Sequence, residues 1–180
     1  MSNLTIELPP QATQTEFNLR RWAELLVDPE VTKIEWRVET DRYGHIIGMP
    51  PAAPRNGSFQ SEIAFLLRSL MRNGRTITEC PISTADGVKA ADVAWASPQC
   101  MADLGESSCF PRSPEICVEV LSPDNTQREI RETRALYFDA GAKETWVCGM
   151  AGEMSFFGPE LSELRGSMLC PDFLRQIELR

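Results

Sequence analysis

The chain of 180 residues is long enough for one domain with a substantial core, and we expect a single domain over residues 1–180. Apolar residues make up 42% and charged residues 24% of the sequence, which is the composition of an ordinary globular protein. The net charge of −8 argues against a protein coated with positive charge for non-specific nucleic-acid binding, although it does not exclude a local basic groove.

The sequence gives little support for a membrane protein, a secreted protein or a zinc-binding protein. No run approaches the roughly 20 apolar residues of a membrane-spanning helix. The N-terminal segment has no basic region followed by an apolar stretch, so we expect a cytoplasmic protein without a secretory signal. The six cysteines form no C-x-x-C pair and only one histidine, His45, accompanies them. We therefore expect buried thiols in a reducing compartment and no zinc site.

The N-terminal part predicts a helix followed by a hairpin. Apolar residues recur at helical spacing over 17–26, and Asp28-Pro29 ends this helix because a residue before proline is pushed out of the α region. Residues 33–39 alternate between apolar and charged side chains, which is the pattern of a half-buried strand. After a turn that contains glycine, residues 45–49 predict a second strand, paired with the first.

The middle of the chain predicts a second helix and two strands. We expect Ser58 to cap this helix and Asn73-Gly74 to end it. A short strand follows over 76–80, and Pro81 begins a connection. After an Asp-Gly turn signal, residues 88–96 predict a longer strand.

The C-terminal part predicts a loop, a helix and several strands. The loop covers 98–114, with a helical turn at 99–104. The helix covers 126–139, with Asp124 or Asn125 as its cap and Gly141 after its end. The predicted strands lie at 115–121, 143–148, 153–157 and 174–179. The whole order of elements predicts a mixed α/β domain in which helices flank a central β-sheet.

Two acidic residues lie inside apolar strand segments. Asp92 stands in Ala-Ala-Asp-Val-Ala-Trp and Glu119 in Cys-Val-Glu-Val-Leu. An isolated buried charge is costly, so such a carboxylate must be paired, protonated or bound to a metal. If neighbouring strands bring the two side chains together, a divalent ion such as Mg²⁺ would remove their repulsion. The alternative is a structural pair of carboxylates at strand ends, solvated or bonded to arginine.

Four short motifs follow one another along the chain. They are Glu39 followed by Gly44-x-Ile-Ile-x-Met-x-Pro, then Ala-Asp92-Val-Ala-Trp, then Pro114-Glu-x-x-Val-Glu119-Val-x-Ser-Pro123, and Tyr137-x-x-x-Gly141-x-x-Glu-x-Trp146-Val. In this order they resemble the Uma-two family, a group of bacterial proteins similar to restriction endonucleases of the PD-(D/E)XK class. The resemblance covers roughly residues 15–180, which is nearly the whole chain.

The resemblance implies a restriction-endonuclease-like core and Mg²⁺-dependent (or Mn²⁺-dependent) cleavage of DNA phosphodiester bonds. Asp92 and Glu119 match the aspartate and glutamate of the motif, and both would be metal ligands. Glu39 matches the acidic residue of the first hairpin and would be a further polar member of the catalytic site. The resemblance also implies a homodimer.

The chain departs from the family pattern where a lysine is expected. The class has Glu-x-Lys, but Leu121 takes the place of that lysine, and Thr133 stands where the family commonly carries a lysine on the next helix. Arg131 and Arg134 lie off the helix face of Thr133, and strand alternation would put Lys89 on the face opposite Asp92. The alternative function is therefore a catalytically inactive nuclease-fold protein that binds nucleic acid or a protein partner.

Overall fold

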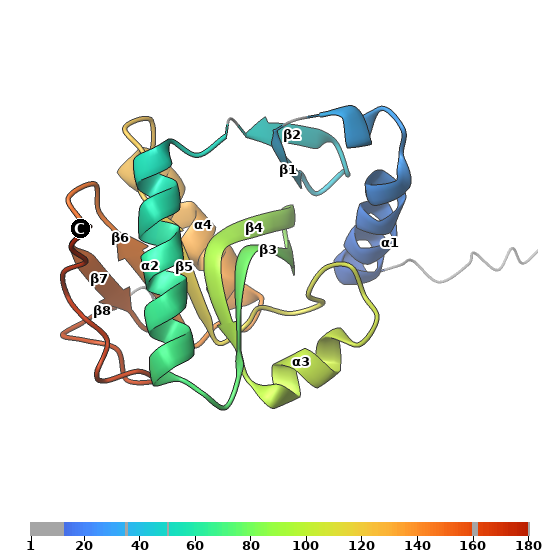
Figure 1. Cartoon of the computed structure of the whole chain (residues 1–180). Helices are drawn as coiled ribbons and strands as arrows, with labels where there is room; N and C mark the ends of the chain where they lie inside the picture. The colour runs from blue at the N-terminus through green and yellow to red at the C-terminus, as the bar shows by residue number, and fades with distance from the viewer. Residues whose placement is uncertain (1–12, 35, 50, 160–161, 180) are drawn as a thin grey trace, which may run out of the picture.

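The computed structural model describes residues 13–34, 36–49, 51–159 and 162–179, which form helices around two β-sheets (Figure 1). The helices are α1 (Gln14–Val27), α2 (Pro54–Leu70), α3 (Pro98–Leu104) and α4 (Gln127–Asp139), with a 3₁₀ turn, η1, at Val31–Lys33. The strands are β1 (Arg37–Thr40), β2 (Ile46–Met49), β3 (Arg75–Thr84), β4 (Gly87–Ala96), β5 (Ile116–Val120), β6 (Glu144–Cys148), β7 (Met154–Phe157) and β8 (Glu163–Leu164). None of the described helices is long and apolar enough to cross a membrane.

The main sheet has six strands in the order β3-β4-β5-β6-β7-β8. All neighbouring pairs are antiparallel except β5 and β6, which run parallel and are joined through α4 as a crossover helix. The hairpin β1-β2 forms a separate two-stranded sheet. This arrangement confirms the predicted mixed α/β fold with a central mixed sheet flanked by helices.

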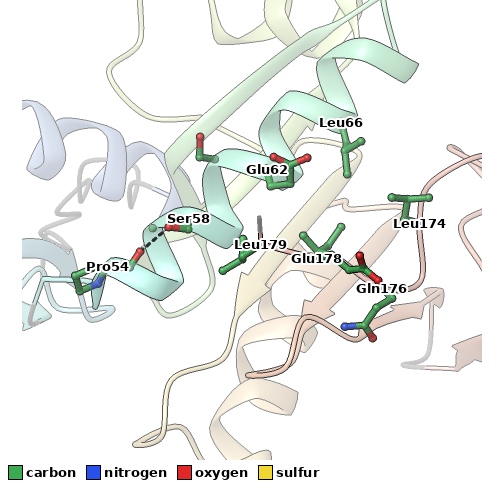
Figure 2. A pocket seen from close by; sticks show the side chains of 11 residues that line it. Pro54, Ser58, Glu62, Leu66, Leu174, Gln176, Glu178 and Leu179 are labelled. Atoms are coloured by element: carbon green, nitrogen blue, oxygen red, sulfur yellow. Dashed lines mark hydrogen bonds between the residues drawn. The ribbon is translucent and has the colours of Figure 1, made fainter.

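Several predicted element boundaries are wrong at their N-terminal ends. The second helix begins at Pro54 and not at Ser58, whose hydroxyl donates to the Pro54 carbonyl at 3.0 Å inside the first turn (Figure 2). Proline suits the first helical position because its fixed φ is already helical and its missing N–H would be unpaired there. The cap of α4 is Thr126, one position beyond the predicted Asn125, in a capping box with Glu129.

The first predicted strand is shorter than expected, and the strand predicted over 76–80 is longer. Residues 31–33 form η1, residue 35 lies outside the described residues, and β1 covers only the end of the predicted 33–39. Strand β3 continues through Pro81, which pairs with Ala90. Proline is tolerated there because β3 is an edge strand of the main sheet.

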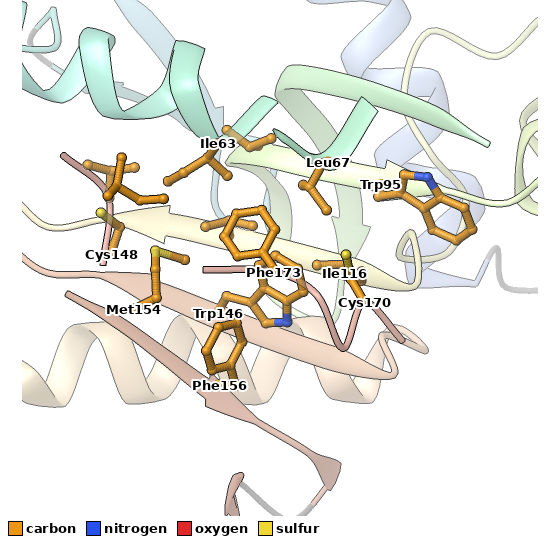
Figure 3. Packing of buried hydrophobic residues seen from close by; sticks show 14 of the residues in the cluster. Ile63, Leu67, Trp95, Ile116, Trp146, Cys148, Met154, Phe156, Cys170 and Phe173 are labelled. Carbon is orange, nitrogen blue, oxygen red and sulfur yellow. The ribbon is translucent and has the colours of Figure 1, made fainter. Parts of the chain in front are cut away.

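The main core lies between α2 and one face of the central sheet (Figure 3). Ile63 and Leu67 of α2 pack there in full burial, and Trp146 of β6 is fully buried beside them. The Trp146 ring lies 4.6 Å, centroid to centroid, from that of Phe173 in the C-terminal segment. The strand predicted over 174–179 is wrong, because this segment forms a single bridge at Gln176 and serves mainly to cover the core.

A second core cluster covers the other face of the sheet. It joins α3 and α4 to the strands and consists of Cys80, Ile82, Ala91, Ala94, Ala96, Cys100, Phe110, Cys117, Tyr137 and Ala142. The six cysteines of the chain are all buried free thiols, as the sequence predicts. The central strands β4 and β5 are therefore enclosed on both faces, which explains why polar side chains within them need specific partners.

The hairpin β1-β2 is fixed against the start of β4. The Thr40 hydroxyl accepts a hydrogen bond from the Val88 N–H at 2.9 Å. Gly87, with φ of +85°, precedes this contact, and a side chain there would come within 2.3 Å of the Thr40 carbonyl. From α1, the buried Asn18 amide donates to the carbonyls of Thr84 and Gly87. These bonds set the position from which β1 presents its side chains to β4.

Candidate active site

Asp92 and Glu119 lie side by side where β4 and β5 separate. The ladder between these strands ends at the pair Val93 and Val118, and Asp92 and Glu119 occupy the next position in the same register. At this position a side-chain hydrogen bond takes the place of backbone pairing between the strands. The Val120 N–H donates to Asp92 Oδ2 at 2.7 Å. The sequence prediction that neighbouring strands bring these two carboxylates together agrees with this geometry, while their role as metal ligands stays a prediction.

Glu119 is held by the helix that follows its strand. The Tyr137 hydroxyl of α4 donates to Glu119 Oε1 at 2.7 Å, and Tyr137 itself is buried. Burial and the neighbouring charge of Asp92 raise the pKa of Glu119 well above its usual value, although the Tyr137 hydrogen bond and the charge of Arg37 act in the opposite direction. Glu119 therefore holds a proton more strongly than a surface glutamate does.

Glu39 reaches the same region from the hairpin. Its Oε1 accepts a hydrogen bond from the backbone N–H of Ala90, two residues before Asp92, at 3.1 Å. Burial raises the pKa of Glu39, while the bond from Ala90 and the charge of Arg37 lower it in part. The three predicted site residues thus come from two sheets that meet at β4.

Arg37 is a site residue that the sequence analysis missed. Its Nη1 lies 2.7 Å from Asp92 Oδ1 and 3.1 Å from Glu79 Oε2, and its Nη2 lies 3.8 Å from Glu39 Oε1. Burial disfavours the charged guanidinium, but the charges of Asp92, Glu79 and Glu119 outweigh this effect and raise the pKa of Arg37 above its ordinary value. One guanidinium therefore lies within 4 Å of three carboxylates at the point where β4 and β5 separate, which we call the fork of the sheet.

The alternating strand pattern contained a signal for this residue. Arg37 and Glu39 are two positions apart, so they share the charged face of the predicted strand. That face turns toward β4 and carries charged groups of the site. The interpretation of strand-end carboxylates bonded to arginine thus matches the observed contact of Asp92.

The two positions that the family pattern reserves for lysine carry no charge and are half-buried. Leu121 follows β5 directly, and its backbone N–H donates to the Cys148 carbonyl at 2.8 Å. Thr133 lies in α4, between the exposed Arg131 and the buried Arg134. Neither side chain can supply the positive charge of a lysine.

The other cations that the sequence analysis weighed are engaged elsewhere. Lys89 donates to the Thr40 carbonyl at 3.2 Å and lies 3.4 Å from the carboxylate of Asp86, at the far end of β4. The Arg134 guanidinium stacks on the Phe157 ring, 3.7 Å from its centroid, and burial lowers its pKa. In the described part of the chain, the cation that forms an ion pair with a predicted site carboxylate is Arg37.

The chemistry of the fork suits a hard divalent cation. Asp92 and Glu119 supply carboxylate oxygens, and Mg²⁺ commonly uses one or two protein carboxylates together with water and phosphate. Within the described residues, no three or more His, Cys, Asp or Glu side chains are arranged around a common ion position. Two carboxylates fit such an ion, and the Arg37 guanidinium is the positive charge that faces Asp92.

A pocket of about 900 Å³ lies elsewhere, between α2 and the C-terminal segment (Figure 2). Its lining includes Ser58, Glu62, Leu174, Glu178 and Leu179, and none of the site residues described above contributes to it. We therefore place the candidate active site at the fork of β4 and β5 and not in this pocket.

The solved structures that are similar to this chain in fold include one of a protein from Anabaena variabilis. It is described as the "crystal structure of a putative nuclease belonging to DUF820". It aligns with a TM-score of 0.60 and 19% sequence identity over 71% of this chain and 74% of that one. A likeness at this identity shows that the two chains share a fold. No match was found among the curated proteins.

A family model extends the comparison to the sequence. The model named Uma2, described as "Putative restriction endonuclease", matches residues 22–160. This range includes β1 to β7 and therefore Arg37, Glu39, Asp92 and Glu119. The resemblance inferred from the four sequence motifs is confirmed, and the chain belongs to the Uma2 family of restriction-endonuclease-like proteins.

Proposed function

We propose that this chain is a divalent-metal-dependent nuclease that hydrolyses DNA phosphodiester bonds at Asp92 and Glu119. The observation that carries the proposal is the side-by-side placement of these carboxylates at the point where β4 and β5 separate. Membership of the Uma2 family, described as putative restriction endonucleases, and the fold shared with a putative nuclease support phosphodiester hydrolysis as the reaction. Family members of the restriction-endonuclease-like type generally use divalent metals.

Asp92 and Glu119 would hold Mg²⁺ or Mn²⁺. When bound, such an ion polarises a phosphodiester and lowers the pKa of a coordinated water. The chain fixes both carboxylates, because the Val120 N–H binds Asp92 Oδ2 and the Tyr137 hydroxyl binds Glu119 Oε1. These bonds orient the ligands before an ion arrives, and they leave Glu119 Oε2 to the ion.

Glu39 would act as the further polar group of the site. Burial raises the pKa of Glu39 toward neutral pH, and a general base is most effective when its pKa is near the working pH. The bond from the Ala90 N–H to Oε1 fixes its direction relative to β4. We assign Glu39 the role of a proton acceptor or of a group that orients water.

The experiment is a cleavage assay on supercoiled plasmid DNA with EDTA, Mg²⁺ or Mn²⁺. Wild type should convert the plasmid only when a divalent ion is present. Asp92→Asn and Glu119→Gln should lose about 100-fold or more of the rate, as when a charge-stabilising group is removed from an active site. The exposed Asp124→Asn provides a matched control. Cleavage that continues unchanged in Asp92→Asn would reject this site.

We also propose that the active form is a homodimer, because one such site cuts one strand and a second copy is needed to cut both. Light scattering after size-exclusion chromatography measures the assembly directly. Linear plasmid should then appear together with nicked circles. A monomer that gives only nicked circles would reject the dimer but keep the nuclease proposal.

A second candidate function is DNA binding without cleavage. Leu121 and Thr133 carry no charge, and Arg37 is already paired with Asp92, which favours this candidate. Fluorescence anisotropy with a labelled DNA duplex tests it. Binding that tightens at low salt, combined with intact DNA in Mg²⁺ and Mn²⁺, would establish this second function in place of the first.

A further inference from the structure

The carboxylates at the fork of β4 and β5 outnumber the cations. Asp92, Glu79 and Glu39 all lie within 4 Å of the Arg37 guanidinium, and Glu119 adds a further carboxyl group beside Asp92. Among the described residues, Arg37 is the cation within ion-pair distance of these acidic side chains, and Lys89 adds a positive charge that acts on Glu39. Such a group of acidic side chains attracts a further cation, and a divalent ion brings twice the charge of a guanidinium.

Arg37 binds the oxygen of Asp92 that the backbone leaves free. Asp92 Oδ2 is engaged by the Val120 N–H at 2.7 Å, and Oδ1 receives Arg37 Nη1 at the same distance. The Asp92 side chain is only 8% exposed, so solvent cannot easily replace either partner. An ion that binds Asp92 must therefore share Oδ1 with the guanidinium or displace it.

Glu79 contacts the same nitrogen of Arg37 as Asp92 does. It lies in β3 between Thr78 and Cys80, whose partners Val93 and Ala91 flank Asp92. Its φ of +51° is in a region that residues other than glycine seldom adopt, and such conformations persist only where the surroundings impose them. The contact at 3.1 Å between Glu79 Oε2 and Arg37 Nη1 shows that this strained position directs a carboxylate at the guanidinium.

We propose that Arg37 is a resident cation of the site, which competes with a divalent metal ion for Asp92 and so sets how tightly the site holds that ion. The inference rests on the metal site proposed above and adds a residue that determines its affinity. The guanidinium is permanently charged, so the competition persists over the whole range of physiological pH.

The test is calorimetric titration of Mn²⁺ into wild type, Arg37→Gln and Arg37→Lys. Arg37→Gln should bind the ion about 10- to 100-fold more tightly than wild type, which is the size of effect that groups beside a metal ligand produce. Arg37→Lys keeps the charge but cannot hold one nitrogen against Asp92 and Glu79 and a second nitrogen near Glu39, and it should bind the ion a few-fold more tightly than wild type. Arg128→Gln, which removes an exposed arginine paired with Glu132, should match wild type.

A second readout is the thermal midpoint with EDTA and with excess Mn²⁺. Mn²⁺ should raise the midpoint of Arg37→Gln more than that of wild type, because a ligand that binds only the folded state stabilises it by an amount that grows with the logarithm of its affinity. If Arg37→Gln does not fold, the comparison of Arg37→Lys with wild type decides.

The outcomes separate the two proposals. Equal or weaker Mn²⁺ affinity in a folded Arg37 variant overturns the inference and leaves the metal site intact. Failure of wild type and both Arg37 variants to bind Mn²⁺ overturns the metal site and the inference with it. Tighter binding in Arg37→Gln, lost again in the double variant with Glu119→Gln, supports the inference even if no protein cleaves DNA.

Discussion

Replacing Asp92 by alanine should destabilise the fold as well as the site. The side chain is 8% exposed and has two partners, the Val120 N–H through Oδ2 and Arg37 through Oδ1. Alanine removes both acceptors, so the Val120 N–H stays buried without a partner and Arg37 loses its shortest ion pair. Asparagine has nearly the same shape and keeps a carbonyl oxygen for the Val120 N–H.

The two losses have different sizes. A buried N–H without a partner costs about 1–3 kcal/mol. Breaking a fully buried ion pair costs about 3–5 kcal/mol, but Arg37 is 24% exposed and keeps Glu79 and Glu39, so about 1 kcal/mol is the appropriate share. Relief of the repulsion between Asp92 and Glu119 offsets part of this. We therefore expect Asp92→Ala to lose about 2–3 kcal/mol and Asp92→Asn about 1 kcal/mol.

Urea unfolding at 25 °C in EDTA, followed by circular dichroism, measures these free energies of unfolding. The exposed Asp124→Ala serves as a control and should stay within about 0.5 kcal/mol of wild type. If Asp92→Ala and Asp92→Asn are equally stable, the bond to Val120 does not support the fold and the reasoning is refuted. If the prediction is confirmed, loss of cleavage in Asp92→Ala alone cannot be assigned to chemistry, and Asp92→Asn is the informative variant.

Three further predictions concern pH, packing and the hairpin. In EDTA, Glu119→Gln should gain stability relative to wild type as pH rises. Burial and the charge of Asp92 raise the pKa of Glu119. The folded state therefore gains stability from the protonated Glu119, fully so below the ordinary pKa of 4.5, and loses this gain as pH rises through the raised pKa. A difference in free energy of unfolding between Glu119→Gln and wild type that stays constant from pH 4 to pH 8 would contradict this. Leu67→Ala, in the fully buried core beneath α2, should cost about 2–5 kcal/mol in the same urea assay, whereas the exposed Leu70→Ala should cost much less. Gly87→Ala should weaken the contact of the hairpin with β4, since its side chain would lie 2.3 Å from the Thr40 carbonyl; an unchanged thermal midpoint would argue against this contact.

The sequence was most informative where chemistry and pattern coincide. A carboxylate within an apolar strand is conspicuous because burial makes it costly, so Asp92 and Glu119 could be identified without a structure. The short motifs around them also identified the family. Helix α1 followed from the spacing of its apolar residues and the proline that follows it, because these signals are local in the chain.

The rest depends on contacts between distant segments. Arg37 lies on a charged strand face that looks the same whether it meets water or another sheet, and only the docking of the hairpin on β4 distinguishes the two. The sequence predicts that the strand ends at Pro81, because proline fits β3 only if β3 is an edge strand, and this is visible only in the assembled sheet. The apolar residues of 174–179 have the pattern of a strand. In the structure Ile177 packs into the main core, while the segment pairs with β-structure only through the bridge at Gln176.

The division of the site between two sheets has a consequence for dissecting this protein. The hairpin β1-β2 supplies Arg37 and Glu39, while the main sheet supplies Asp92 and Glu119. A fragment that begins at α2 would retain the main sheet and its core, yet it would expose an unbalanced acidic fork. Domain boundaries drawn around the main sheet alone would therefore separate the charges that define the site, and expression of the chain for functional work should keep the hairpin and α1 together with it.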